Sequence, residues 1–144
     1  HHLPAATLKT FVRAKTPARV ALVSDAVSLG GLPPGTYARG RYAVEPSGRV
    51  VTAGTPYLAG AGFLLDTGVA FAAARTDLGL SGAVRCATEV PARLLGLAPR
   101  IGHLTPGSDA DLVLFAEPAP DQPLEILLTL RAGRIVHHAG VHTP

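Results

Sequence analysis

The segment LVSDAVSLGGLPPG, residues 22–35, decides how the rest of the chain is interpreted. An apolar run ends in Ser24-Asp25 and continues into a loop rich in glycine and proline. Consecutive apolar residues are typical of a parallel strand that is covered on both faces, so residues 19–24 are predicted to form a strand. Barrel enzymes and open α/β enzymes place catalytic groups where such strands end, which makes Asp25 the first candidate.

Two interpretations of Asp25 follow from the residues alone. A carboxylate at the end of a buried strand can ligate a metal or accept a proton from metal-bound water, which is the task of a general base in hydrolysis. Alternatively, the carboxylate accepts hydrogen bonds from the backbone N–H groups of the turn that follows it. The segment by itself leaves both interpretations open.

Composition narrows the class of protein. The chain has 144 residues, of which 47% are hydrophobic, and this is enough for one domain with a core. Its formal charge of +3 comes from basic residues scattered singly, with few aromatic residues beside them, which argues against nucleic-acid binding. The one cysteine excludes an internal disulfide and fits a reducing compartment. No apolar stretch reaches the roughly 18 residues of a membrane span, so we expect a cytoplasmic protein that does not bind membranes.

The order of elements predicted along the chain is helix, strand, hairpin, helices, strands. Ser81 is predicted to cap a helix that is interrupted before Pro91, and Gly96 is predicted to end the helical region. The strand at 19–24 lacks an obvious parallel neighbour. The predicted ranges are a helix at 4–15, a hairpin around the turn 46–48, a corner of small residues at 58–62, helices at 63–75 and 92–95, and strands at 111–117, 125–130 and 134–140, the last two joined at Ala132-Gly133.

Other side chains that could carry chemistry have simpler interpretations. His137 and His138 are adjacent in a predicted strand, so they point to opposite faces and do not form one site. His103 lies in a turn, where a structural or solvated histidine is expected. Cys86 is expected to be a small core residue and not a nucleophile. The glycine-rich segments match neither the GxxxxGK[ST] pattern nor a strand-linked GxGxxG pattern, so phosphate-loop interpretations fail.

Five segments together resemble a known family. SDAVSLGGLPPGTY, GTPYLAGAG, GAVRCATEVPARLLGL, RIGHLTPGSDADLVLF and TLRAGRIVHHAG occur in an order and spacing similar to the C-terminal part of N-acetylglucosamine-6-phosphate deacetylase, a branch of the amidohydrolase superfamily. The resemblance covers essentially the whole chain. It implies an α/β fold in which residues 1–102 are the C-terminal part of a metal-dependent hydrolase (β/α)8 TIM barrel. Residues 103–144 are then strands of a small β-sandwich domain.

The same resemblance implies roles for individual residues. Asp25 corresponds to the catalytic aspartate, which acts as general base toward metal-bound water and then as general acid toward the departing amine, and it is also a possible metal ligand. The substrate-binding residues implied are His2, Leu58, Ala59 and Gly60. The family's usual polar residue after Leu-Ala-Gly is replaced here by alanine.

The resemblance also implies a cofactor and partners. A divalent metal, zinc or iron, is implied, although the family's other metal ligands lie in earlier strands that these residues do not contain. We therefore expect the isolated 144 residues to be inactive. The predicted function is hydrolysis of the acetamide of N-acetylglucosamine 6-phosphate by a complete protein that forms a homodimer. The alternatives are another amidohydrolase, such as a cyclic amidase or a deaminase, and a non-catalytic β-rich binding module.

Overall fold

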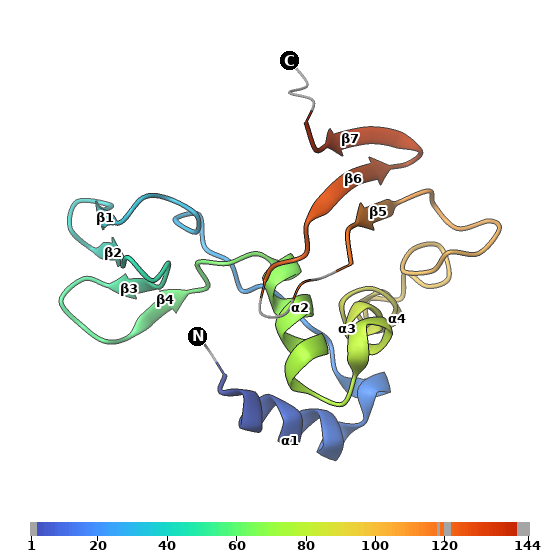
Figure 1. Cartoon of the computed structure of the whole chain (residues 1–144), viewed down its shortest axis with the longest axis horizontal. Coiled ribbons are helices and arrows are strands. Elements are labelled where there is room, and N and C mark those ends of the chain that lie inside the picture. Colours follow the sequence, from blue (N-terminus) through green and yellow to red (C-terminus); the bar gives the residue numbers. More distant parts are fainter. Residues whose placement is uncertain (1–2, 118, 120–121, 141–144) are drawn as a thin grey trace.

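The computed structural model of the chain describes residues 3–117, 119 and 122–140. These residues form three groups of elements, which Figure 1 shows side by side: a small sheet, a group of helices and a second small sheet. The first sheet contains β1 (Gly35–Tyr37), β2 (Tyr42–Val44), β3 (Val50–Thr52) and β4 (Leu58–Gly60). The helices are α1 (Ala5–Lys15), the 3-10 turn η1 (Pro17–Arg19), α2 (Leu65–Arg75), α3 (Gly79–Ala87) and α4 (Glu89–Leu94). The second sheet contains β5 (Leu112–Phe115), β6 (Ile126–Arg131) and β7 (Arg134–His138).

The predicted strand at residues 19–24 is wrong. Its first residue ends η1, and residues 20–25 run on without a ladder of strand hydrogen bonds. The Leu22 N–H donates to the Cys86 carbonyl at the end of α3, 2.8 Å away. A strand exists only where a neighbouring strand accepts and donates backbone hydrogen bonds. Within the described ranges, a helix end takes that place beside Leu22.

The first sheet extends the predicted hairpin. The hairpin around residues 46–48 is confirmed by β2 and β3, which pair antiparallel across that turn. β1 and β4 add to its two edges, so that the sheet has the order β1-β2-β3-β4 with antiparallel neighbours throughout. Val44, Val50 and Val51 are buried and provide its core. The predicted small-residue corner at 58–62 therefore begins with a strand, because Leu58–Gly60 pairs with β3.

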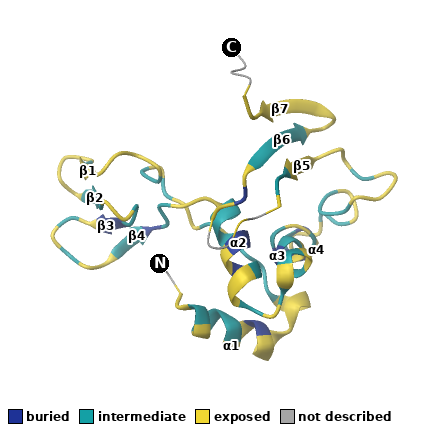
Figure 2. Ribbon diagram, in the orientation of Figure 1, coloured by how far each residue is buried: buried dark blue, intermediate teal, exposed yellow. Residues whose placement is uncertain are grey.

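The helices hold the main hydrophobic core. The predicted helices at 4–15 and 63–75 are confirmed by α1 and α2. Buried residues from α2 and α3 pack together with Leu124, which precedes β6, and Figure 2 shows buried residues where α2 and α3 meet. The members of this core cluster are Val69, Ala70, Ala72, Ala83 and Leu124.

One detail of the helical region differs from the prediction and two agree with it. Ser81 does not cap α3, which already begins at Gly79 without a side-chain cap. The interruption before Pro91 is confirmed, because α3 ends at Ala87 and α4 begins at Glu89. Pro91 itself lies within the first turn of α4, where its missing N–H breaks no helical hydrogen bond. Gly96 is confirmed as the helix end: it has a φ of 69°, and the N–H of Leu97 donates to Ala92, as in a Schellman motif.

The second sheet confirms the three predicted C-terminal strands. β5, β6 and β7 pair antiparallel in sequence order. The turn at Ala132-Gly133 has φ values of 48° and 75°, the left-handed pair that a tight type I′ hairpin requires. Both sheets of the described residues are antiparallel, and their one parallel pairing is an isolated bridge between Ala26 and Ala61. No helix within the described ranges is long and apolar enough to cross a membrane.

Candidate active site

Asp25 lies on an exposed loop that folds on itself. The Ser24 side-chain oxygen accepts a hydrogen bond from the Ala26 N–H at 3.3 Å, and the Gly30 N–H donates to the Val27 carbonyl at 2.9 Å. Asp25 has a φ of 52°, in the left-handed region that aspartate tolerates better than most residues do. The aspartate is therefore displayed at a sharp bend where the extended segment ends.

The bend is attached to the end of β4 by backbone hydrogen bonds. The Ala61 N–H donates to the Asp25 carbonyl at 2.8 Å, and the Val27 N–H donates to the Ala61 carbonyl at 3.2 Å. These two bonds form the isolated parallel pairing between Ala26 and Ala61. The backbone from Asp25 to Val27 is thus tied to a residue that lies more than 30 positions further along the chain.

Glycines make this close approach possible. Gly60 has a φ of 151°, and a Cβ atom there would overlap Val27 Cγ1 and lie 3.2 Å from the Asp25 carbonyl oxygen. A Cβ atom at Gly62 would overlap the Gly48 carbonyl oxygen in the β2–β3 turn. Gly60 and Gly62 therefore let the end of β4 lie between the loop of residues 24–30 that carries Asp25 (the Asp25 loop) and the β2–β3 turn.

The structure brings some of the predicted site residues together. Gly60 lies directly against the Asp25 loop. Leu58 and Ala59 are half-buried residues of β4, and Leu58 pairs with Val51 of β3. His2 lies outside the described residues. A role for any of these four residues in binding substrate stays a prediction.

A metal site is not formed by the described residues. Among them, no three His, Cys, Asp or Glu side chains come together in a way that could hold a metal ion. A catalytic zinc takes about three protein ligands and a water molecule. Asp25 alone does not fit such a metal, and no chemical step through a metal follows from these residues.

Other titratable side chains lie away from this arrangement. Cys86 is fully buried, and burial raises the pKa of its thiol, which opposes nucleophilic chemistry. Hydrogen bonding to Arg85 lowers the pKa of Glu89, and the two groups form an exposed ion pair at 2.8 Å between neighbouring helical turns. His137 and His138 are exposed neighbours on β7, so the predicted strand around them is confirmed.

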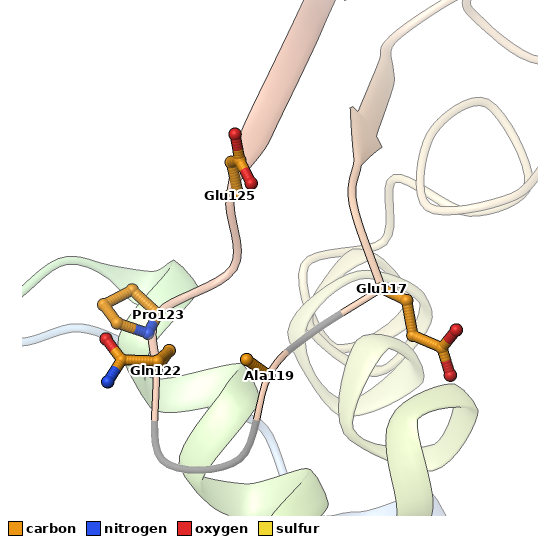
Figure 3. A pocket seen from close by; sticks show the side chains of 5 residues that line it. All are labelled: Glu117, Ala119, Gln122, Pro123 and Glu125. Carbon is orange, nitrogen blue, oxygen red and sulfur yellow. The ribbon is translucent and has the colours of Figure 1, made fainter.

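A cavity of about 300 Å³ lies at the connection between β5 and β6. Figure 3 shows that its two carboxylates, Glu117 and Glu125, come from opposite arms of this connection and do not converge. The remaining lining residues are Ala119, Gln122 and Pro123. None of the predicted site residues lines this cavity, and two exposed carboxylates that point apart do not define a binding site.

Sequence reasoning missed the residues that hold Asp25 in place. Ala61 and Val27 contribute backbone groups, which leave no signal of residue type. The alternation of Gly60 and Gly62 was the available signal, since glycines at every second position indicate close backbone approach on one face of a strand. Sequence reasoning instead places both glycines in a small-residue corner and gives Gly60 a role in substrate binding.

Comparisons with known proteins agree on one family. A sequence model of the amidohydrolase family matches residues 2–136. The chain is 34% identical over 136 residues to N-acetylglucosamine-6-phosphate deacetylase of Danio rerio, covering 94% of the chain and 32% of that protein. It is 33% identical over 114 residues to N-acetylgalactosamine-6-phosphate deacetylase of Escherichia coli O157:H7, covering 78% of the chain and 30% of that protein.

The fold comparison points the same way. The crystal structure of N-acetyl-D-glucosamine-6-phosphate deacetylase from Mycobacterium smegmatis superposes with a TM-score of 0.81 and 31% identity, covering 94% of the chain and 35% of that structure. An aspartate-to-alanine variant of the same enzyme has been solved in complex with N-acetyl-D-glucosamine-6-phosphate. The chain therefore belongs to the amidohydrolase family, and it spans about a third of the length of these relatives.

Proposed function

We propose that this chain is the C-terminal part of a metal-dependent hydrolase that removes the acetyl group from N-acetylglucosamine 6-phosphate. One observation carries the proposal: Asp25 stands exposed at a sharp bend, and the backbone from its carbonyl to the N–H of Val27 is tied to Ala61 at the end of β4. A catalytic carboxylate needs such a fixed position next to open space for a substrate. Resemblance to deacetylases over nearly the whole chain supports the choice of reaction.

Amide hydrolysis requires a group that first accepts a proton and then donates it, and we assign this role to Asp25. Amide hydrolysis adds water to the acetyl carbonyl, breaks the C–N bond and releases acetate and the amino sugar. Asp25 takes a proton from the attacking water and later gives it to the departing nitrogen, so that the carboxylate is regenerated at the end of the cycle. Its exposed place at the end of the extended segment leaves room for both the water and the sugar amide.

Further parts of the proposal concern the complete protein. Residues 1–102 belong to a (β/α)8 barrel and residues 103–144 to a small β-sandwich, which is supported by the superposition on deacetylase structures. Zinc or iron is bound by ligands outside the described residues, with Asp25 as a possible additional ligand. The protein is a cytoplasmic homodimer, a location that is supported by the single cysteine. Substrate contacts from His2, Leu58, Ala59 and Gly60 belong to the same proposal.

A second candidate substrate is N-acetylgalactosamine 6-phosphate. The E. coli deacetylase named for this sugar is 33% identical to the chain over 114 residues, nearly the same identity as the glucosamine relatives show. The two sugars differ only in the configuration of one hydroxyl group. The identities therefore favour an N-acetylated amino-sugar phosphate more strongly than either particular sugar.

The test is a panel of substrates given to the complete protein purified with its metal. We expect acetate release from N-acetylglucosamine 6-phosphate, and slower release from N-acetylglucosamine without phosphate. A preference for the galactosamine phosphate would select the second candidate. Hydrolysis of a cyclic amide such as dihydroorotate, with no acetate released from any sugar, would replace the deacetylase by another amidohydrolase. No turnover of any of these compounds by a metal-loaded protein would favour a non-catalytic binding module.

A further inference from the structure

We propose that Gly60 is a positioning residue for Asp25, and that residues 60–62 act as a backbone clamp on the catalytic loop. The proposal rests on the proposed function, because it assigns a role in the same reaction. It differs from the predicted role of Gly60 in substrate binding, since the close approach that this glycine permits is to the protein's own chain.

The clamp is made of contacts from two sides. On one side, Ala61 bonds to the Asp25 carbonyl at 2.8 Å and to the Val27 N–H at 3.2 Å. A Cβ atom at Gly30, at the far end of the loop, would lie 3.1 Å from the Gly62 carbonyl oxygen. The loop is therefore held against residues 60–62 both at Asp25 and five residues later.

On the other side, the clamp is braced by the first sheet. A Cβ atom at Gly62 would overlap the Gly48 carbonyl oxygen, and a Cβ atom at Gly48 would lie 2.9 Å from the Phe63 ring. β4 also pairs with the buried strand β3. Residues 60–62 cannot shift away from the Asp25 loop without moving the β2–β3 turn, which makes the four-stranded sheet the support for the catalytic loop.

Gly60 is the position at which a side chain would open the clamp. Its added Cβ atom would overlap Val27 Cγ1, two residues after Asp25, which carries the bend, and its φ of 151° disfavours any side chain. Gly54 offers a matched comparison in the β3–β4 turn. Its φ is also positive, 76°, but a Cβ atom there meets nothing within 4 Å. Alanine at Gly54 introduces backbone strain in the same sheet without pushing on the loop.

The two possible roles of Gly60 predict different kinetics. A displaced Asp25 carboxylate lowers the rate of the chemical step while the ground-state affinity for the sugar stays the same, so kcat falls and KM does not. A lost substrate contact raises KM instead. A displacement of about 1 Å at a catalytic group costs on the order of 100-fold in rate.

The experiment compares four variants of the complete, metal-loaded protein: Gly60→Ala, Val27→Ala, the double variant, and Gly54→Ala. We expect Gly60→Ala to lower kcat by about 100-fold with KM nearly unchanged. The double variant should recover part of that loss, because the overlapping Val27 methyl group is gone. Gly54→Ala should keep the wild-type kcat. A rise in KM alone for Gly60→Ala, or an equal loss of kcat for Gly54→Ala, overturns the proposal.

Two further readouts keep the test decisive. If Gly60→Ala does not fold, the double variant should still fold, because removal of the Val27 overlap leaves only backbone strain of the kind that Gly54→Ala also introduces. Failure of both variants overturns the proposal. If the wild-type protein releases no acetate from either sugar phosphate, the proposed function has failed, and amide hydrogen exchange at Ala61 then tests the clamp. Exchange should be at least about tenfold faster in Gly60→Ala than in Gly54→Ala, and equal rates overturn the clamp itself.

Discussion

Truncating Leu124 should loosen the attachment of the second sheet to the helices. Leu124 is 7% exposed and is the member of the core cluster that comes from the connection between β5 and β6, whereas the other members lie on α2 and α3. Leu124→Ala removes most of a buried side chain and leaves a cavity between helices and sheet. For such a change, the free energy of unfolding falls by about 2 to 5 kcal/mol.

Leu104 provides the matched control because it is the same residue type at 82% exposure. Leu104→Ala should change the free energy of unfolding by no more than about 0.5 kcal/mol. Urea unfolding followed by circular dichroism measures both variants. With a slope of about 2 kcal/mol per molar urea, a loss of about 3 kcal/mol moves the midpoint by roughly 1.5 M. Equal midpoints for the two variants would refute the argument that Leu124 joins the sheet to the helical core.

Three smaller predictions concern a thiol, a turn and an ion pair. Cys86 is fully buried, and burial raises the pKa of its thiol. A disulfide reagent at pH 8 should therefore label Cys86 slowly in the native protein and at once in guanidinium. Rapid labelling of the native protein would contradict this burial. Ala132 occupies a left-handed turn position that asparagine favours. Ala132→Asn should therefore raise the free energy of unfolding by about 0.5 to 1 kcal/mol. A lower melting temperature of this variant would count against the type I′ turn. Hydrogen bonds from Arg13 and then Lys9 lower the pKa of Asp77 below 3.8, so this carboxylate adds stability above pH 3.8 that is lost as the pH falls through its lowered pKa. The small difference in melting temperature between the wild type and Asp77→Asn should therefore shrink as the pH is lowered from 7 to 2.5. A difference that grows on acidification would show that the folded protein does not stabilise the charged form of Asp77.

Local signals predicted most of the secondary structure. The helices at 4–15 and 63–75, the β2–β3 hairpin and the Ala132-Gly133 turn depend on residues close in sequence, so apolar spacing and turn residues were enough to place them. Ser81 misled because a serine near a helix start becomes a cap only when the first free N–H groups face it, and α3 begins before that residue.

Elements that depend on distant partners could not be placed in this way. Residues 19–24 have the composition of a buried parallel strand, but strand formation requires a neighbouring strand, and Leu22 instead bonds to the end of α3. The small residues at 58–62 suggested a corner, although pairing with β3 makes part of them a strand. In both cases the outcome was set by backbone groups more than six residues away.

In the candidate site too, the sequence reveals what depends on residue type and does not reveal what depends on distant backbone contacts. Asp25 was found because a carboxylate after an apolar run, in a segment shared with a known family, is a signal of residue type. The clamp was not found, because the bonds from Ala61 to Asp25 and Val27 use backbone atoms and join segments 34 to 36 positions apart. The sequence shows the alternating glycines Gly60 and Gly62, but not which segments they contact. The structure shows that Gly60 lies against Val27 and that Gly62 lies against Gly48.

The most direct test of the account is the turnover of Asp25→Asn in the complete, metal-loaded protein with N-acetylglucosamine 6-phosphate. Asparagine keeps the size of the side chain but cannot carry the proton, so kcat should fall by about 100- to 10,000-fold. Asp109→Asn is the control, since Asp109 is exposed and its side chain forms a long ion pair with Arg100 at 3.7 Å. We expect Asp109→Asn to turn over like the wild type. Full activity of Asp25→Asn, measured alongside an active wild-type protein, would contradict the assignment of Asp25 as the proton carrier.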